Sequence, residues 1–421
     1  MARPTTSNPL ELDGRTLEGG GQLIRIALCL SALTGTPIRI SNVRGNRSGG
    51  GGLKAQHIAC VEWLARACNA TVHGATKGSQ TLLFQPGRYE GELSPVFTKR
   101  TLDDGRQVYE CRVDMTSAGS TALVLQAILP FILFSRLPSR LPIHLHLSGG
   151  TNSSGSPSFE YITYVLLPTL HRIGFPEMKA TLGQRGWSQG ATSIGNWTLE
   201  IPPRSSPVLP TFTYQPTDPS IPPSLPSHLH AIFLGPAACH DQVSALLLPQ
   251  IHQHFSPYFT ASSSNFTLTL HDSHHPKRIY FILIATIPSS SSSSSQSATY
   301  ILARDHLQLR KFPTAAIILS EIIPRVTAEL ASDWRSGAWV DEHMRDQLVI
   351  FQALAEGRCG VFPGRREEDV DLREPSLHAR TAEWVARSML GVRFDAQGVC
   401  EGVGFEGEDV LVERLEKLEV E

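Results

Sequence analysis

The chain has 421 residues, of which 41% are hydrophobic and 18% are charged, and its formal net charge is −2. This length allows two domains with cores of their own, and the composition is that of a globular protein. The near-neutral charge argues against a protein that coats nucleic acid non-specifically. The most apolar segment, residues 122–134, is too short to span a bilayer and predicts a buried helix. We therefore expect no membrane partner.

The seven cysteines are scattered and include no CxxC pair. This pattern argues against a structural zinc site and favours buried thiols in a reducing compartment. Residues 1–8 contain no apolar signal core. We expect an intracellular protein of the nucleus (nucleoplasm) or the cytoplasm rather than a secreted one.

The first half of the chain alternates short strand-like runs with apolar helices that follow glycine- or serine-rich turns. The predicted helices are residues 22–33, 55–67, 121–133 and 159–173, and the predicted strands are residues 38–43, 81–84, 109–114 and 143–147. This alternation predicts α/β or α+β units that are repeated along the chain. Helices that begin after such turns present free backbone N–H groups, which suit phosphate.

The composition of the chain changes at residues 202–226, where nine prolines predict a linker or loop. Predicted strands and helices follow at 231–234, 241–254, 266–271, 278–287, 298–303 and 314–332, interrupted by a low-complexity serine run at 289–295. Helices at 340–356 and 376–389 and a strand at 392–395 complete the chain. We predict a large domain (1–203 and 333–421) with a small inserted domain (204–332).

A glycine-rich turn, Glu18-Gly-Gly-Gly-Gln22, is followed one turn later by Arg25. Three glycines let a backbone pass close to a ligand, Glu18 has the chemistry to position a metal–phosphate group, and Arg25 can pair with an anion. Taken alone, such a turn is more often structural.

A basic segment follows, because no Asp or Glu lies between Glu18 and Glu62. Arg44 and Arg47 lie on a glycine-rich loop, from which paired guanidinium groups can bind an oxyanion. The alternative is a solvated basic loop without a ligand.

Two further candidates lie near the C-terminus. His378 stands at the start of a predicted helix, where a neutral imidazole is favoured and can act as a nucleophile toward phosphorus; a cap or packing role is the alternative. Asp346 and Gln347 fall on one helical turn and can hold a cation or bond the His378 ring. Alternatively, they form the polar face of an amphipathic helix.

Six separated motifs nevertheless occur in a set order along the chain. They are Glu18-Gly-Gly-Gly-Gln22 with Arg25; Arg44-x-x-Arg47-Ser with Gln56-His57; Ser117-Ala-Gly-Ser120 leading to Gln126-x-x-Leu-Pro130; Ser148-Gly-Gly-Thr151; Asp346-Gln347-Leu; and Pro375-Ser-x-His378-x-x-Thr381. With these motifs the chain resembles the RNA 3′-terminal phosphate cyclase family over about residues 12–395.

The resemblance implies an α+β fold, with a large domain of repeated four-strand, two-helix units and an inserted small α/β domain. It implies ATP and a divalent cation (Mg or Mn) as cofactors, and as partner an RNA with a 3′-phosphate end. The family's histidine takes AMP from ATP, AMP passes to the RNA 3′-phosphate, and the 2′-hydroxyl displaces it to close a 2′,3′-cyclic phosphate.

The same resemblance assigns roles to residues. Those roles are nucleophile (His378), ATP or adenylate binding (Glu18, Gln22, Asp346, Gln347 and Pro130), phosphate or RNA binding (Arg25, Arg44, Arg47 and Gln56) and metal binding (Glu18).

The chain departs from the family pattern in two stretches, at Asn152-Ser-Ser-Gly-Ser-Pro-Ser and around Trp187. Both bear on recognition of the acceptor more than on adenylation. One branch of the family lacks the histidine and serves as a binding protein in ribosome biogenesis, which is the main alternative. Enolpyruvyl transferases share a similar repeated fold, but they need neither His378 nor the Asp-Gln helix.

Overall fold

The structure is a computed structural model, and it describes residues 8–47, 49–87, 94–135, 137, 140–214, 222–257, 259–261, 263–289, 299–309, 314–366 and 371–406. These residues form an α+β fold in which helices pack on several small mixed sheets. Among the helices of these ranges, none is both long and apolar enough to cross a membrane.

The first unit has four strands and two helices. They are β1 (Leu10–Asp13), α1 (Gly21–Thr34), β2 (Ile38–Ser41), α2 (Ala55–Ala67), β3 (Thr71–His73) and β4 (Leu82–Gln85). Strands β1 and β2 are parallel with α1 between them, and β4 pairs antiparallel with both β2 and β3.

The second unit repeats this order after the edge strand β5 (Thr98–Thr101). Its elements are β6 (Gln107–Asp114), α3 (Thr121–Phe134), β7 (Ile143–Gly149), α4 (Phe159–Tyr161) joined by a π-helical turn to α5 (Leu167–Arg172), β8 (Lys179–Gln184) and β9 (Gly195–Ile201). Again the first two strands, β6 and β7, are parallel and the rest pair antiparallel.

A third unit begins at β10 (Thr213–Tyr214) and resumes far along the chain. Its later elements are α8 (Glu342–Leu354), β15 (Glu356–Val361), α9 (Leu377–Leu390) and β16 (Val399–Val403). Strand β10 pairs in parallel with β15, and β16 pairs antiparallel with β15. The predicted repetition of units is therefore confirmed.

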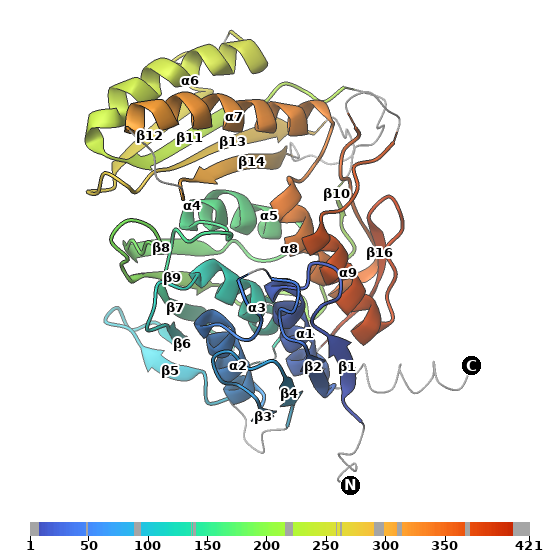
Figure 1. Ribbon diagram of the computed structural model, residues 1–421. Helices are drawn as coiled ribbons and strands as arrows, with labels where there is room; N and C mark the ends of the chain where they lie inside the picture. The colour runs from blue at the N-terminus through green and yellow to red at the C-terminus, as the bar shows by residue number, and fades with distance from the viewer. Residues whose placement is uncertain are drawn as a thin grey trace.

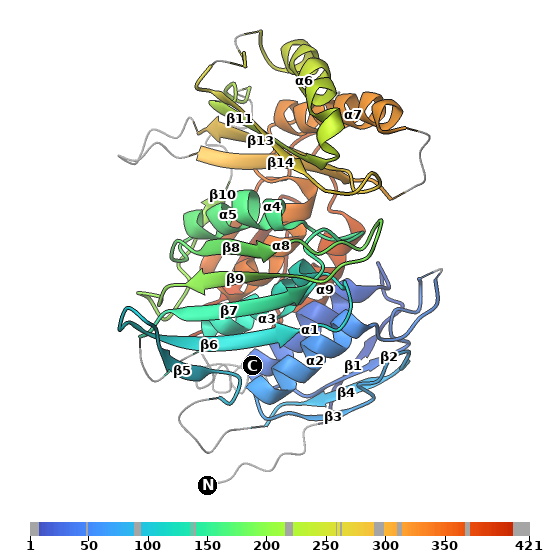
Figure 2. The ribbon, with the colours of Figure 1, turned by 90° about the vertical axis from the view of Figure 1, so that its left-hand side faces the viewer.

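Between β10 and α8 the chain forms a separate sheet with the strand order β12-β11-β13-β14. Its elements are β11 (His228–Gly235), α6 (His240–His254), β12 (Phe266–Asp272), β13 (Tyr280–Pro288), β14 (Thr299–Leu307) and α7 (Ala315–Arg335). Helices α6 and α7 cover one face of this sheet, and α4 and α5 lie beneath the other (Figures 1 and 2). We call the four strands β11 to β14 the inserted sheet. The exact bounds of the inserted domain stay a prediction.

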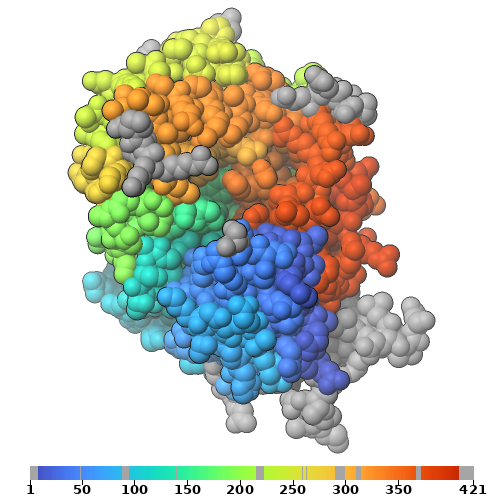
Figure 3. All heavy atoms as spheres, viewed as in Figure 1, coloured from blue at the N-terminus to red at the C-terminus, as the bar shows by residue number. Residues whose placement is uncertain are grey.

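The first helix, α1, and the last, α9, pack in one helical layer. Helix α9 packs against both α1 and α8, and α1 also packs against α2 and α3. In the space-filling view the first unit (blue) and the third unit (red) accordingly lie side by side (Figure 3). Helix α3 is the apolar segment predicted to be buried, and nearly all of its residues are.

Two sequence predictions near the C-terminus are wrong. Residues 392–395 form no strand, because Phe394 makes only an isolated bridge and the Asp395 carboxylate accepts bonds from the N–H groups of Gln397 and Val399, which turns the chain. The strand there is β16. The helix predicted to reach residue 356 ends at Leu354, where β15 takes over. Most of the serine run and the acidic C-terminal stretch lie outside the described residues.

Candidate active site

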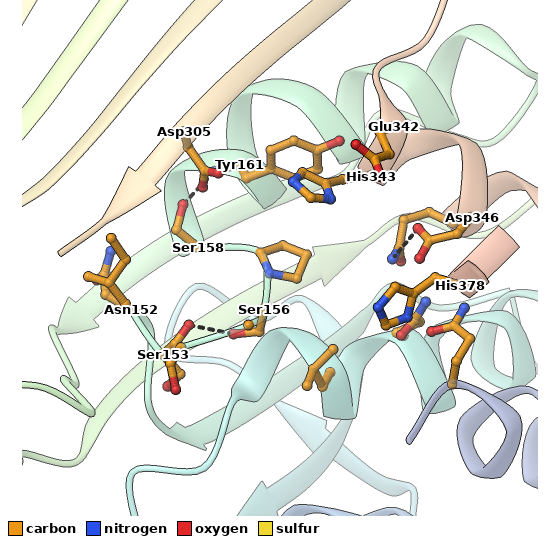
Figure 4. A pocket seen from close by; sticks show the side chains of 18 of the residues that line it. Asn152, Ser153, Ser156, Ser158, Tyr161, Asp305, Glu342, His343, Asp346 and His378 are labelled. Atoms are coloured by element: carbon orange, nitrogen blue, oxygen red, sulfur yellow. Dashed lines mark hydrogen bonds between the residues drawn. The ribbon is translucent and has the colours of Figure 1, made fainter. Parts of the chain in front are cut away.

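A cavity of about 420 Å³ lies where the helical layer meets the inserted sheet. Its walls come from the starts of α1, α8 and α9, from α3, from the loop at residues 152–158 and from the end of β14. Figure 4 shows His378 and Asp346 at one end, Asn152 and Ser153 at the other, and His343 along the wall between them.

Five of the predicted site residues line this cavity together. They are Gln22, Arg25, Asp346, Gln347 and His378. They come from α1, α8 and α9, so positions more than 350 residues apart in the sequence are brought to one place by the packing of these three helices.

His378 lies in the first turn of α9, and local hydrogen bonds fix that turn. The Ser376 hydroxyl caps the helix by accepting a bond from the N–H of Ala379 (3.1 Å). The Thr381 hydroxyl accepts a bond from the N–H of Glu18 (3.1 Å) and donates to the carbonyl of Leu377 (2.7 Å). Thr381 therefore ties the helix that carries His378 to the glycine-rich turn.

The surroundings of His378 keep its imidazole neutral. Burial lowers its pKa below the usual value, and the positive charges of Arg25, Arg47 and His343 lower it further, against a smaller opposing effect of Glu342. A neutral imidazole has a free lone pair, which is the form that attacks phosphorus.

Arg25 is a buried cation held between two amides. Its Nε donates to Oε1 of Gln126 (2.5 Å) and its Nη2 to Oε1 of Gln22 (2.7 Å). Burial lowers its pKa to about 10, and no salt bridge of Arg25 with a carboxylate occurs among the described residues. A buried charge without a counter-ion is costly, so an anion in the cavity would stabilise this arrangement.

Asp346 is a buried carboxylate whose pKa lies close to neutral pH. Burial raises its pKa to about 7, against the opposing charges of His343 and Arg25. The Nε2 of Gln347 donates to its Oδ1 (3.3 Å). Asp346 can therefore hold or accept a proton near neutral pH.

His343 was not predicted as a site residue, yet it lines the cavity. Burial by itself would lower its pKa, but the carboxylates of Asp305, Asp341 and Asp346 outweigh burial and raise it. Its spacing of three residues from Asp346 places both on one face of α8, which is the signal the sequence offered. Asp305 belongs to β14, and nothing in its local sequence indicated that it would reach the cavity.

Pro130 is one of the predicted ligand-binding residues that do not line the cavity. It lies buried inside α3 and is not among the residues that line the cavity. The proline in the wall is Pro157, and the α3 side chain in the wall is Gln126. The reason is helical geometry: Gln126 and Pro130 are four residues apart, but proline's short ring stays within the packed helix while the glutamine amide extends to Arg25.

Glu18, Arg44, Arg47 and Gln56 lie around the glycine-rich turn, outside the cavity lining. Arg47 pairs with Oε1 of Glu18, Nη1 of Arg44 donates to the carbonyl of Gly52 (3.1 Å), and Oε1 of Gln56 accepts from the N–H of Ser120 (3.3 Å). Of the four, Arg47 is the one whose charge reaches His378.

The two stretches that depart from the family pattern have different positions. Residues 152–158 line the cavity, and the loop is braced by a bond from Nδ2 of Asn152 to Glu160 (3.2 Å), whose other oxygen pairs with Arg185 (2.5 Å). Trp187 is only 1% exposed, lies beneath the Arg278 guanidinium (5.6 Å) and does not line the cavity. The first stretch is therefore the one that can contact a ligand.

A divalent cation would have to find most of its ligands outside the protein. Across the described ranges no three His, Cys, Asp or Glu side chains cluster as a metal site. Oε2 of Glu18 is buried and lacks a hydrogen-bond partner, so it has a free lone pair for a cation. Mg²⁺ typically takes one or two carboxylates, with phosphate and water oxygens as its other ligands, and Glu18 fits that role.

A comparison with family models identifies the family of the chain. The family model described as "RTC: RNA 3'-terminal phosphate cyclase" matches residues 16–396, which is nearly the whole chain. The matched range contains every residue of the cavity wall. At the level of the family, the match supports a cyclase- or ligase-type enzyme that acts on RNA. The chain belongs to the RNA 3'-terminal phosphate cyclase family.

Proposed function

We propose that the protein uses ATP to convert RNA 3′-phosphate ends to 2′,3′-cyclic phosphates through a covalent histidine–AMP intermediate on His378. The observation that carries this proposal is a neutral, partly buried imidazole in the same cavity as an unpaired buried arginine, Arg25. The imidazole supplies a nucleophile, and the guanidinium supplies a counter-charge for a phosphate.

In the first step the free ring nitrogen of His378 attacks the α-phosphorus of ATP. A nitrogen–phosphorus bond forms, the bond to the bridging oxygen breaks, and pyrophosphate leaves. Arg25, fixed by Gln22 and Gln126, balances the negative charge on the phosphate, and pre-positioned charge of this kind lowers the barrier to the displacement. Asp346, with its pKa near 7, is placed to accept the proton that the ring must lose.

In the later steps AMP passes to the RNA. An oxygen of the 3′-phosphate attacks the adenylate phosphorus, the nitrogen–phosphorus bond breaks, and Asp346 returns the proton to the ring, so that His378 leaves as a neutral imidazole. The adjacent 2′-hydroxyl then loses its proton to water, attacks the 3′-phosphorus and expels AMP. Dividing the reaction in this way replaces one difficult displacement by easier ones.

A divalent cation bound at Glu18 would neutralise phosphate charge. Its protein ligand would be the unpartnered Oε2 of Glu18, since Oε1 is paired with Arg47. Thr381 holds the backbone of Glu18 against the helix of His378, so the cation-binding residue and the nucleophile keep a set spacing.

The first test is covalent labelling with ATP that carries a radioactive α-phosphate, in the presence of Mg²⁺ or Mn²⁺. We expect label on the wild-type protein and at least a 1,000-fold loss in His378→Gln, because removal of a nucleophile abolishes the covalent step. The control is His252→Gln: this histidine of α6 bonds the carbonyl of Phe259, away from the cavity. An unlabelled wild-type protein would favour the alternative of a catalytically silent binding protein in pre-rRNA processing.

The second test identifies the acceptor. An RNA that ends in a 3′-phosphate should become resistant to phosphatase after incubation with the protein and ATP, whereas the same RNA with a 3′-hydroxyl should stay unchanged. If the protein is labelled but neither RNA changes, adenylation stands and the cyclisation part of the proposal is wrong. The control is the His378→Gln protein on the 3′-phosphate RNA, which should leave it sensitive.

A further inference from the structure

Asp333, near the end of α7, is a buried carboxylate shared by two arginines from different parts of the fold. Its side chain is only 3% exposed. Arg304 of β14 donates to both of its oxygens, from Nε (2.6 Å) and Nη2 (3.0 Å). Arg373 donates to Oδ1 from Nη1 (2.6 Å). Asp333 therefore joins the inserted sheet to the segment that precedes α9.

Arg373 is held along its whole length. Its Nη2 donates to the hydroxyl of Ser332 (3.0 Å) and to the carbonyl of the same residue (3.3 Å), its own N–H donates to the carbonyl of Gly364 (2.9 Å), and its carbonyl accepts from Nη1 of Arg345 in α8 (3.1 Å). Only two residues separate Arg373 from Ser376, the cap of the helix that carries His378. The anchored segment is thus too short to move independently of the start of α9.

This cluster forms part of the wall of a second cavity, of about 500 Å³, next to the first. Both cavities have Glu342 and Ser376 in their walls. The two arginines and Asp333 therefore line a cavity that shares Ser376, the cap of α9, with the cavity of His378.

We infer that Asp333 and Arg373 are positioning residues for His378: through the Asp333–Arg373 pair, the end of α7 fixes the start of α9 and so holds the imidazole at the catalytic cavity. A guanidinium–carboxylate pair suits this task because it is directional as well as attractive. Thr381 fixes the same helix through a separate contact, with the backbone of Glu18, so two independent anchors define where His378 lies. The inference rests on the proposed adenylation at His378.

The inference predicts a chemical signature as well as a loss of rate. His378 owes its low pKa to burial first and then to the charges of Arg25, Arg47 and His343. A start of α9 that is no longer anchored would expose the ring and move it away from these cations. The pKa of His378 should then rise toward its ordinary value, which a merely destabilising substitution elsewhere would not cause.

The decisive variant is Arg373→Gln, because it leaves Asp333 paired with Arg304 and so avoids a buried unpaired charge. Asp333→Asn, which is nearly isosteric, is the second. The control is Arg335→Gln, two residues beyond Asp333 on α7, whose Nη2 donates to the carbonyl of His254 (3.1 Å). The full-length proteins are compared below their unfolding temperatures, by rapid-quench labelling with α-labelled ATP over a range of ATP concentrations and by NMR titration of the His378 ring.

We expect the maximal rate of labelling to fall roughly 10- to 100-fold in Arg373→Gln and in Asp333→Asn, as for a small misplacement of a reacting group, while the ATP concentration for half-maximal rate changes less than about threefold. The pKa of His378 should rise in both variants and stay unchanged in Arg335→Gln. A wild-type rate, or a reduced rate with an unchanged His378 pKa, would overturn the inference. If the wild-type protein takes no label, the proposed function fails, and the NMR titration still decides on the positioning role.

Discussion

The chemistry of the site depends on a few ionisable side chains whose protonation is set by burial. Arg25 and His378 share the cavity, and the charge of the first helps to keep the second neutral. The carboxylates around His343 instead raise its pKa, against the effect of burial. The pKa values of two histidines in one cavity are therefore shifted in opposite directions, as is common where a nucleophile and a cation are both needed.

Removal of a neighbouring cation should make His378 easier to protonate. Arg47 lowers the pKa of His378 by its charge, so Arg47→Gln should raise that pKa and shift the acid limb of the labelling rate to higher pH. NMR titration of the ring, beside the rate profile, checks the assignment. The matched control is Arg39→Gln, because Arg39 is an exposed residue of β2 that pairs with Glu11 of β1. This control should leave the pKa of His378 unchanged. Equal His378 pKa values in the wild-type protein and both variants would contradict the expected role of Arg47.

Ionised Asp346 should lower the free energy of unfolding, because its buried side chain disfavours the charged form. Its pKa is about 7 in the folded protein, whereas the ordinary value of an Asp side chain is 3.8, so the folded state binds more protons than the unfolded state between these values. The contribution of Asp346 to the free energy of unfolding is therefore fully present below about pH 4 and is lost as the pH rises toward 7. Asp346→Asn should raise the free energy of unfolding at pH 8 by roughly 1–3 kcal/mol and slow labelling at least 10-fold.

Urea unfolding of the two proteins at pH 5 and pH 8 measures this effect. The stability difference between them should be larger at pH 8 than at pH 5. A difference that is the same at both pH values would mean that Asp346 does not titrate in this range, and a difference larger at pH 5 would give the wrong sign.

At the scale of elements, the start of α9 is the most demanding part of the fold. The helix needs a cap at Ser376, an anchor before it and a bond from Thr381 to the glycine-rich turn. Its buried face (Ala379, Ala382, Val385, Ala386 and Met389) recurs at spacings of three and four residues, which packs it against α1 and α8. The glycine at its end, Gly391, has a φ of 72°, which glycine adopts without strain.

Loss of the cap should affect the reaction more than stability. Ser376→Ala removes an N-cap bond worth about 1 kcal/mol, and we expect labelling to slow by about 10-fold because the freed turn carries His378. Thr314→Ala removes the corresponding cap of α7 and should cost similar stability with little change in rate. Thermal unfolding and labelling of both variants check this; equal rate losses would show that the cap acts through stability alone.

At the scale of the whole molecule, the cavity exists because the inserted sheet is pinned to α8. Asp341 accepts bonds from the hydroxyl of Tyr161 (2.7 Å) and from the N–H of Ala303 in β14 (3.2 Å), and it caps α8 through His343 and Met344. One buried carboxylate thereby joins the second unit, the inserted sheet and the helix that carries Asp346.

Substitution of this carboxylate should destabilise the protein strongly. Asp341→Ala leaves several buried donors without an acceptor, so we expect the free energy of unfolding to fall by roughly 3 kcal/mol or more. Asp104→Ala, which removes an exposed carboxylate paired with Arg106, should change it by less than about 0.5 kcal/mol. Urea unfolding of both proteins decides, and a loss below 1 kcal/mol for Asp341→Ala would contradict this role.

The sequence by itself determined the repeated α+β units, most helices and the family, because apolar periodicity, helix-start signals and ordered motifs are local properties. It also indicated Gln22, Arg25, Asp346, Gln347 and His378, which stand in such motifs, and the structure brings these five together. Eight strands were missed, since their pairing depends on distant partners; they are β1, β3, β5, β8, β9, β10, β15 and β16.

Only the tertiary structure decided which of the remaining residues reach the cavity. It places Pro157, His343 and Asp305 in the cavity wall, and it leaves Pro130, Glu18, Arg44, Arg47 and Gln56 outside the lining. The reason is physical: whether a side chain lines a cavity, and which charge it carries there, depends on burial and on neighbours that are hundreds of residues away in the chain. Those neighbours meet only when α1, α8, α9 and the inserted sheet pack together.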